Sequence, residues 1–337
     1  MCRRFSAMYG TGLSVTDCLS SLARESESKR LSAILGDIHE MIRQGRSIAD
    51  AFSKYPKVFP VFFVNMIRVG ETTGNFEYVL NELDLYMEKQ QDLRRKIRQA
   101  LTYPVVVLVM IFLVVAALMM VVMPVFGEVY TKLGVDLPLP TITLISLSNN
   151  AVYIFPALIG LLVGLWIVYK KLSAISTVRR YFDGRKLSLP LIGTVYHKIT
   201  LLRFVRTLGL MINAGIPLSD ALSIAQAVAN NAVISEAADM IQRSINSGGT
   251  LTLAVSLHDF FPQSVVHSFA AGERAGNLGE MLAKVAMGIE RDVDDMIKRL
   301  ITKFEPILTT VLSLVVGFIL IAIYLPIFDL IKALRTH

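Results

Sequence analysis

The sequence predicts an all-α, polytopic membrane protein with three transmembrane helices and two homologous cytoplasmic helical-bundle domains. Composition is the first indication: 53% of the 337 residues are hydrophobic, 18% are charged, and the mean hydropathy is +0.55. Soluble chains carry about 25% charged residues, so much apolar surface must face lipid. Three long uncharged stretches could supply the spans. The motif Gly-Glu-x-x-Gly-Asn occurs at Gly70 and again at Gly272, which indicates an internal duplication.

Residues 1–103 are expected to form the first cytoplasmic helical domain. The stretch RQGRSIADAFSKYPKVFP contains a glycine break, a short helical segment and a Phe-Pro stop. The opening MCRRFSAMYG is not followed by the apolar segment of a signal peptide. The second domain has a longer leading helix, LIGTVYHKITLLRFVRT. We therefore expect that Met1 lies inside what was originally a longer first helix, and that this domain is short at its N-terminus.

Residues 104–126 are expected to form the first transmembrane helix. They lie in a stretch without charge between Arg98 and Glu128, and a spanning helix needs about 20 apolar residues. The alternative is a buried helix of a soluble protein. Insertion scales of about −0.3 to −0.6 kcal/mol per large apolar residue favour the membrane by several kcal/mol. A short periplasmic loop, residues 127–141, follows.

Residues 142–169 are expected to form the second transmembrane helix. No charge occurs between Asp136 and Lys170, and Pro156 can kink the helix where neighbouring helices support it. Asn149 and Asn150 are strongly polar residues near its outer end, suited to interhelical or interfacial hydrogen bonds. This helix returns the chain to the cytoplasm, so both domains have the same orientation.

Residues 170–304 are expected to form a cytoplasmic linker and the second helical domain. In GIPLSDALSIAQAVA, Gly215 ends one helix and Pro217 occupies the first turn of the next. Residues 305–328 are the third expected transmembrane helix, and residues 329–337 a periplasmic tail.

Basic residues set the orientation, because Lys and Arg concentrate on the cytoplasmic side of spans. They precede the first span, follow the second and precede the third: Lys89, Arg94, Arg95, Lys96, Arg98; Lys170, Lys171, Arg179, Arg180, Arg185, Lys186; Lys298, Arg299, Lys303. The N-terminus is therefore expected in the cytoplasm and the C-terminus in the periplasm, although Lys332 and Arg335 weakly oppose this. These basic residues beside the spans account for most of the net charge of +7. Direct nucleic-acid binding is not expected, because no basic stripe is interleaved with aromatic residues.

The two copies match at a constant offset of 202 residues from Phe59 to Phe126, the end of the first expected span. Upstream of Phe59 the offset changes by one residue. The matched pairs are Phe59 with Phe261, Pro60 with Pro262, Pro104 with Pro306, Pro124 with Pro326 and Phe126 with Phe328. So many matched proline and glycine positions at one offset indicate two copies of one unit.

The repeated motif is expected to form a helix–turn–helix corner in each copy. Gly74 and Gly276 suit a left-handed residue after a helix, and Asn75 and Asn277 can cap the next helix. Glu280 completes a capping-box pattern. The predicted structural turn motif consists of Gly70, Gly74, Asn75, Gly272, Gly276 and Asn277.

The glutamates of the motif do not suit a helix C-terminus, where the helix dipole disfavours anions. Glu71 and Glu273 therefore need a partner, which could be a backbone amide, Arg68 or Arg274, or another protein. The candidate partner-binding residues are Arg68, Glu71, Glu273 and Arg274.

No catalytic, cofactor or metal site is predicted, and the protein is not expected to be an enzyme. The sequence has no phosphate-binding loop, no G-x-S-x-G elbow and no H-E-x-x-H. Its five histidines show no ligand spacing, and Glu290, Asp294 and Asp295 suggest a solvated helix face. A membrane transporter or channel component is the alternative. It is disfavoured because the expected spans contain no Asp, Glu, Lys or Arg.

The sequence resembles the GspF/PilC family, the inner-membrane platform proteins of type II secretion systems and type IV pili. The resemblance rests on GETTGN and GERAGN, LTYPVVVLVM, LLRFVRTLGLMINAGIPLSDAL and FEPILTTVLSLVVGFILIAIYLPIF. It implies a multi-pass protein of the bacterial inner membrane without a cofactor. It also implies as partners a hexameric ATPase, the transmembrane helices of pilin or pseudopilin subunits, other inner-membrane assembly proteins and further copies of the chain.

Overall fold

The computed structural model describes residues 1–122, 124–125 and 192–335, together with scattered positions between 150 and 187. All regular elements in this part of the chain are helices, which confirms the all-α prediction there. The expected loop at 127–141 and most of the expected second span at 142–169 lie outside the described residues, as do the last two residues of the expected tail.

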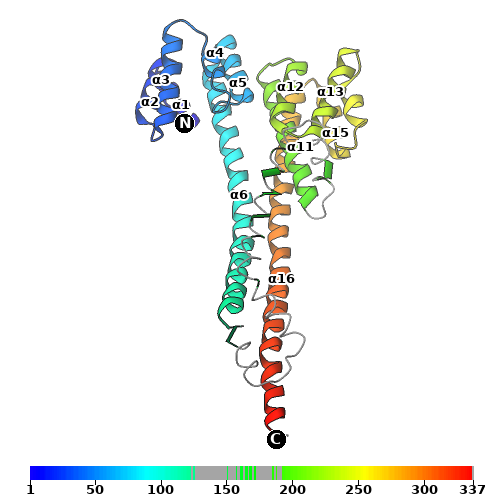
Figure 1. Cartoon of the computed structure of the whole chain (residues 1–337). Coiled ribbons are helices and arrows are strands. Elements are labelled where there is room, and N and C mark those ends of the chain that lie inside the picture. Colours follow the sequence, from blue (N-terminus) through cyan, green and yellow to red (C-terminus); the bar gives the residue numbers. More distant parts are fainter. Residues whose placement is uncertain are drawn as a thin grey trace. The chain divides into compact units, whose positions relative to one another are not determined.

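The first half of the chain forms short helices that lead into one long helix (Figure 1). These are α1 (Cys2–Gly10), α2 (Val15–Glu25), α3 (Lys29–Arg43), α4 (Ile48–Ser53), α5 (Val61–Thr73) and α6 (Phe76–Ala117), followed by the π-helical turn η1 (Leu118–Val122). Serine side chains open α2, α3 and α4 by accepting backbone N–H groups. Phe52, Phe59 and Phe63 pack together with ring centroids 4.7 to 5.2 Å apart, and they anchor α4 to α5.

The second half also forms short helices that lead into a long one. These are α11 (Ile192–Asn213), α12 (Leu218–Ala229), α13 (Ala232–Asn246), α14 (Leu251–Ser256), α15 (Gln263–Ala275) and α16 (Leu278–Arg335). Phe204, Phe261 and Phe269 are buried among them. In Figure 1 the long helices are α6, in cyan, and α16, in orange to red.

The chain divides into two compact units. The first consists of Met1–Arg95 and Arg179–Met296, and it contains all the short helices together with the beginnings of α6 and α16. The second consists of Lys96–Val178 and Ile297–His337, and it contains the apolar parts of the same two helices.

The two long helices are apolar enough to cross a membrane. The segments Phe76–Val121 and Leu278–Ile321 each contain an 18-residue apolar window of which only 11% is buried within the protein. Large side chains such as Val105, Met110 and Leu314 are at least half exposed along them. Exposed apolar surface of this extent is stable in lipid rather than in water. α6 and η1 cover residues 104–122 of the expected first span, and α16 covers the expected third span, residues 305–328.

The first glycine of each repeated motif allows two helices to pack closely. A Cβ atom on Gly70 would lie 2.8 Å from the Cδ2 atom and 3.2 Å from the Cα atom of Phe76. A Cβ atom on Gly272 would lie 3.0 Å from the Cα atom of Leu278. Because these neighbours include backbone atoms, they cannot rotate away, and the start of each long helix depends on glycine here.

We expect Gly272→Ala to lower the free energy of unfolding by about 1–3 kcal/mol, because the added methyl group overpacks the corner. The matched control is Gly288→Ala in α16, where nothing lies within 4 Å of the added Cβ atom. That substitution should stabilise by about 0.5–1 kcal/mol through helix propensity. Thermal unfolding of both purified variants in detergent measures the difference, and equal melting temperatures would contradict the packing argument.

Candidate functional site

Each repeated motif forms a tight corner between a short helix and a long one. Gly74 follows α5 with φ of +70°, and Gly276 follows α15 with φ of +65°. In the second corner the N–H of Asn277 donates to the carbonyl of Gly272 at 3.0 Å, and the N–H of Gly276 to that of Glu273 at 3.4 Å. This pair of bonds satisfies the last carbonyls of α15. The chain then turns directly into the long helix.

The glutamates of both corners accept hydrogen bonds from the N-terminus of a neighbouring short helix. Glu71 accepts the N–H of Ile48 at 2.7 Å and that of Ala49 at 3.1 Å, at the start of α4. Glu273 accepts the N–H of Leu251 at 2.8 Å and that of Thr252 at 3.0 Å, at the start of α14. Of the partners considered from the sequence, backbone amides are therefore the ones that the structure shows.

These contacts explain why an anion stands near the end of α5 and of α15. The first N–H groups of a helix have no partner within the helix and carry its positive dipole end. Each carboxylate uses both oxygens to satisfy two consecutive N–H groups, and the Thr252 hydroxyl also donates to Glu273. Partial burial acts to raise the pKa of Glu273, but these hydrogen bonds outweigh it and lower the pKa below its usual value.

The two arginines of the predicted set remain at the surface. Arg68 lies 3.3 Å from Asp50 in an ion pair whose side chains are 52% and 67% exposed, and such pairs contribute little to stability. Arg274 is exposed, and within the described residues its side chain makes no ion pair or hydrogen bond. Both guanidinium groups are therefore accessible to another molecule.

Arg68 borders a surface groove of about 530 Å³. One wall is α5, with Asn65, Arg68 and Thr72, and the other is the turn between α11 and α12, with Gly215 and Asp220. The groove combines a cation, an anion and hydroxyl groups, which suits a polar protein surface better than a small apolar ligand.

One partly buried ionic contact was not expected from the sequence. Glu290 of α16 lies 2.9 Å from Arg206 of α11 and 3.3 Å from Lys89 of α6, and its side chain is only 20% exposed. The assignment of Glu290 to a solvated helix face is therefore wrong. The pattern along α16 showed which residues share a face, but not that two cations from distant helices meet that face.

The described residues contain no cluster of three or more His, Cys, Asp or Glu side chains placed to hold a metal ion. His197 bonds through Nε2 to the carbonyl of Phe260 at 2.7 Å, a structural contact between α11 and the segment before α15. Burial raises the pKa of the Cys2 and Cys18 thiols. Raised pKa values favour unreactive thiols over nucleophiles.

Comparison with known proteins identifies the family. The model for "Type II secretion system (T2SS), protein F" matches residues 1–124 and 204–326. The type IV pilus assembly protein PilC of Thermus thermophilus is 35% identical over 99% of this chain and 82% of its own length. PilC of Pseudomonas aeruginosa is 31% identical over 97% of this chain and 88% of its own length. The type II secretion system protein F of Pseudomonas aeruginosa is 31% identical, over 97% and 81%. The resemblance found in the sequence is thus confirmed, and the chain belongs to the type II secretion system protein F family.

Proposed function

We propose that this protein is the inner-membrane platform of a type IV pilus or type II secretion machine. The observation that carries the proposal is the family match over nearly the whole chain, to relatives named for both machines. Its structural support is that each apolar helix is continuous with a folded helical domain. A platform needs this combination of a membrane anchor and a surface on which partners assemble.

The proposed mechanism couples a cytoplasmic ATPase to filament growth. The helical domains face a hexameric ATPase, and the spans face the apolar transmembrane helices of pilin or pseudopilin subunits. Motion of the ATPase would turn the platform and move subunits from the bilayer into the filament. Other inner-membrane assembly proteins, further copies of this chain and the lipid bilayer complete the set of partners. The chain itself performs no chemical step in this scheme.

We also propose that the chain arose by duplication and spans the membrane three times. The two segments that match the family model begin 203 residues apart and end 202 residues apart, which is the offset of the repeated motif. The paired glutamate contacts support the same conclusion. In this proposal three spans put the termini on opposite sides of the membrane, and the basic residues that flank the spans favour a cytoplasmic N-terminus and a periplasmic C-terminus.

The four candidate contact residues divide into two roles in this proposal. Glu71 and Glu273 hold the corners, because both oxygens of each carboxylate are already bonded. Arg68 and Arg274 present their guanidinium groups to the ATPase or another acidic partner surface. The glycines and asparagines of the motif set the direction of the corner that carries them.

A transporter or channel component is the second candidate. It would need ionisable side chains or broken helices along a pathway. The apolar parts of α6 and α16 contain none of Asp, Glu, Lys or Arg at positions 104–121 and 306–321. The family match also favours the platform.

Deletion of the gene in its own host should abolish either surface pili or a specific set of secreted proteins. Electron microscopy of the cells and mass spectrometry of the culture supernatant distinguish the two machines. Complementation with the wild-type gene is the control. If neither loss occurred while the machine was expressed, the platform function would be wrong and the transporter alternative would gain support.

The three-span topology predicts opposite results for two reporter fusions. Alkaline phosphatase, which is active only in the periplasm, should be active when fused after residue 337 and inactive when fused after residue 188. A chain that crosses the membrane only through α6 and α16 would give the reverse result, with the fusion after residue 188 active and the fusion after residue 337 inactive. Immunoblotting of the fusions controls for their amounts.

Arg274→Glu should block filament assembly or secretion while the protein level stays within about twofold of wild type, because reversal of an exposed charge costs little stability. Glu273→Gln should instead lower the free energy of unfolding by about 1–2 kcal/mol, because it weakens a charge-assisted cap. Complementation assays with immunoblots and melting curves separate the two effects. Normal assembly with Arg274→Glu and with Arg68→Glu would refute the contact role.

A further inference from the structure

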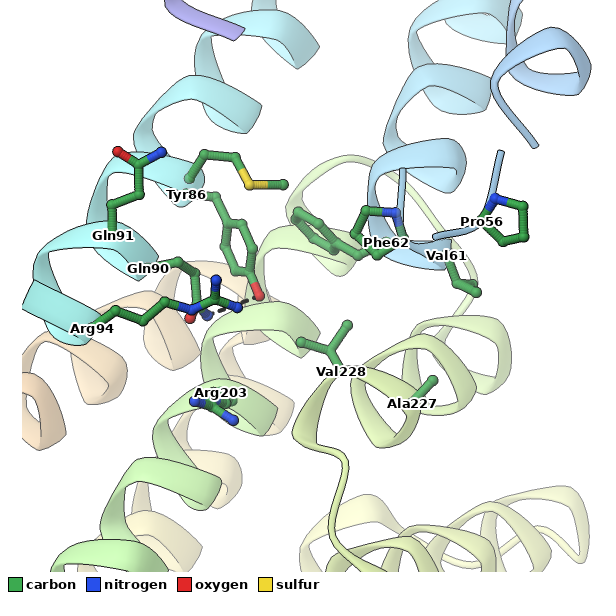
Figure 2. Close-up of a pocket in the computed structure, with 12 residues that line it drawn as sticks. Pro56, Val61, Phe62, Tyr86, Gln90, Gln91, Arg94, Arg203, Ala227 and Val228 are labelled. Carbon is green, nitrogen blue, oxygen red and sulfur yellow. Dashed lines mark hydrogen bonds between the residues drawn. The ribbon is translucent and has the colours of Figure 1, made fainter. Parts of the chain in front are cut away.

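A second pocket, of about 440 Å³, lies within the first compact unit where α5 and α6 approach α11 and α12. Figure 2 shows its two sides. Arg94, Gln90 and the Tyr86 hydroxyl lie on one side, together with Arg203. Val61, Ala227 and Val228 lie on the other. Phe62 and Met87 also line the pocket. A pocket of this size with an apolar wall and a few convergent polar groups has the anatomy of a small-molecule site.

The pocket is positively charged. Two arginines line it, and no Asp or Glu does. The nearby carboxylate of Glu290 already forms ion pairs with Lys89 of α6 and Arg206 of α11, the helices that carry Arg94 and Arg203. Within the described residues, Arg94 and Arg203 have no ion-pair partner.

Arg203 contains a buried donor that the protein does not satisfy. Its Nε atom is buried and has no hydrogen-bond partner. A buried donor without a partner costs about 1–3 kcal/mol, and more when it is charged, so each such group requires an explanation. A guanidinium group offers a planar fork that fits phosphate or carboxylate oxygens.

The pocket also has an aromatic surface that an apolar group can contact, and a hydroxyl group held in one position beside it. The rings of Phe62 and Tyr86 lie 4.1 Å apart between centroids and are nearly fully buried. The Tyr86 hydroxyl accepts a hydrogen bond from Gln90 at 3.0 Å, which holds its position. The site therefore offers contacts to an anionic group and to an apolar group at the same time.

We propose that this pocket binds a water-soluble organic anion, with its phosphate or carboxylate on Arg94 and Arg203 and its apolar body against Val61, Phe62 and Met87. Arg94 stands ten residues before Pro104, the first residue of the expected span, which favours a soluble ligand over a lipid. The second copy of the repeat does not carry these side chains, because Gly288 and Met296 stand 202 residues after Tyr86 and Arg94. Since the ligand contacts helices from both halves, its binding stabilises their packing.

The test uses the purified full-length protein in lipid nanodiscs and three probes: inorganic pyrophosphate, adenosine monophosphate and adenosine. Isothermal titration calorimetry should show binding of pyrophosphate and tighter binding of the monophosphate, because only the latter contacts the apolar wall. Adenosine, which lacks the anion, should bind at least about tenfold more weakly than the monophosphate. Hydrogen exchange should slow at residues 86–94 and 203 when the monophosphate binds.

Arg203→Ala and Arg94→Ala should each weaken binding of both anions by about tenfold or more. Arg94 is exposed, so its variant tests the proposal even if Arg203→Ala fails to fold. Arg43→Ala, an exposed arginine on α3, is the matched control and should bind as wild type does. The proposal is overturned if neither anion binds wild type, if the pocket variants bind as tightly as wild type, or if Arg43→Ala loses as much affinity as they do.

Discussion

The hydrogen bonds that Glu71 and Glu273 accept from the first amides of α4 and α14 are the contacts on which each half depends. Both of these helices have six residues, and isolated helices of that length are unstable in water. Their amides need partners that the helices cannot supply. The glutamates come from the ends of α5 and α15, where the helix dipole disfavours an anion. Each carboxylate therefore stabilises the neighbouring helix and slightly destabilises the helix that carries it.

This contact fixes where the long helices begin. Glu71 sits one residue after Gly70, whose missing side chain lets Phe76 approach, and three residues before the left-handed Gly74. Within seven residues the chain therefore caps one helix, packs against the next and reverses direction. The helix that follows runs without a break into apolar sequence, so the geometry of the corner determines the direction in which the apolar helix starts.

Local chemistry explains what the sequence could predict. The apolar helices, the positive φ of Gly74 and Gly276 and the breaks at Gly215 and Pro217 depend on neighbouring residues alone. The partners of Glu71 and Glu273 were left open because the amides lie 21 to 23 residues upstream. Glu290 was misassigned because its cations come from other helices. The unpaired Nε of Arg203 has no sequence signal, since it depends on what is absent around it.

The contact between the two halves differs from the contacts within each half. The halves are individually closed by aromatic packing and by the glutamate caps. Between them, Lys89 of the first half pairs with Glu290 of the second, while Arg94 and Arg203, one from each half, have no ion-pair partner among the described residues. Excess positive charge opposes close packing, because the repulsion between cations and the cost of removing them from water both increase as they are buried. An interface that carries uncompensated charge is therefore one whose free energy an anion can change substantially, without any change in the two folded halves.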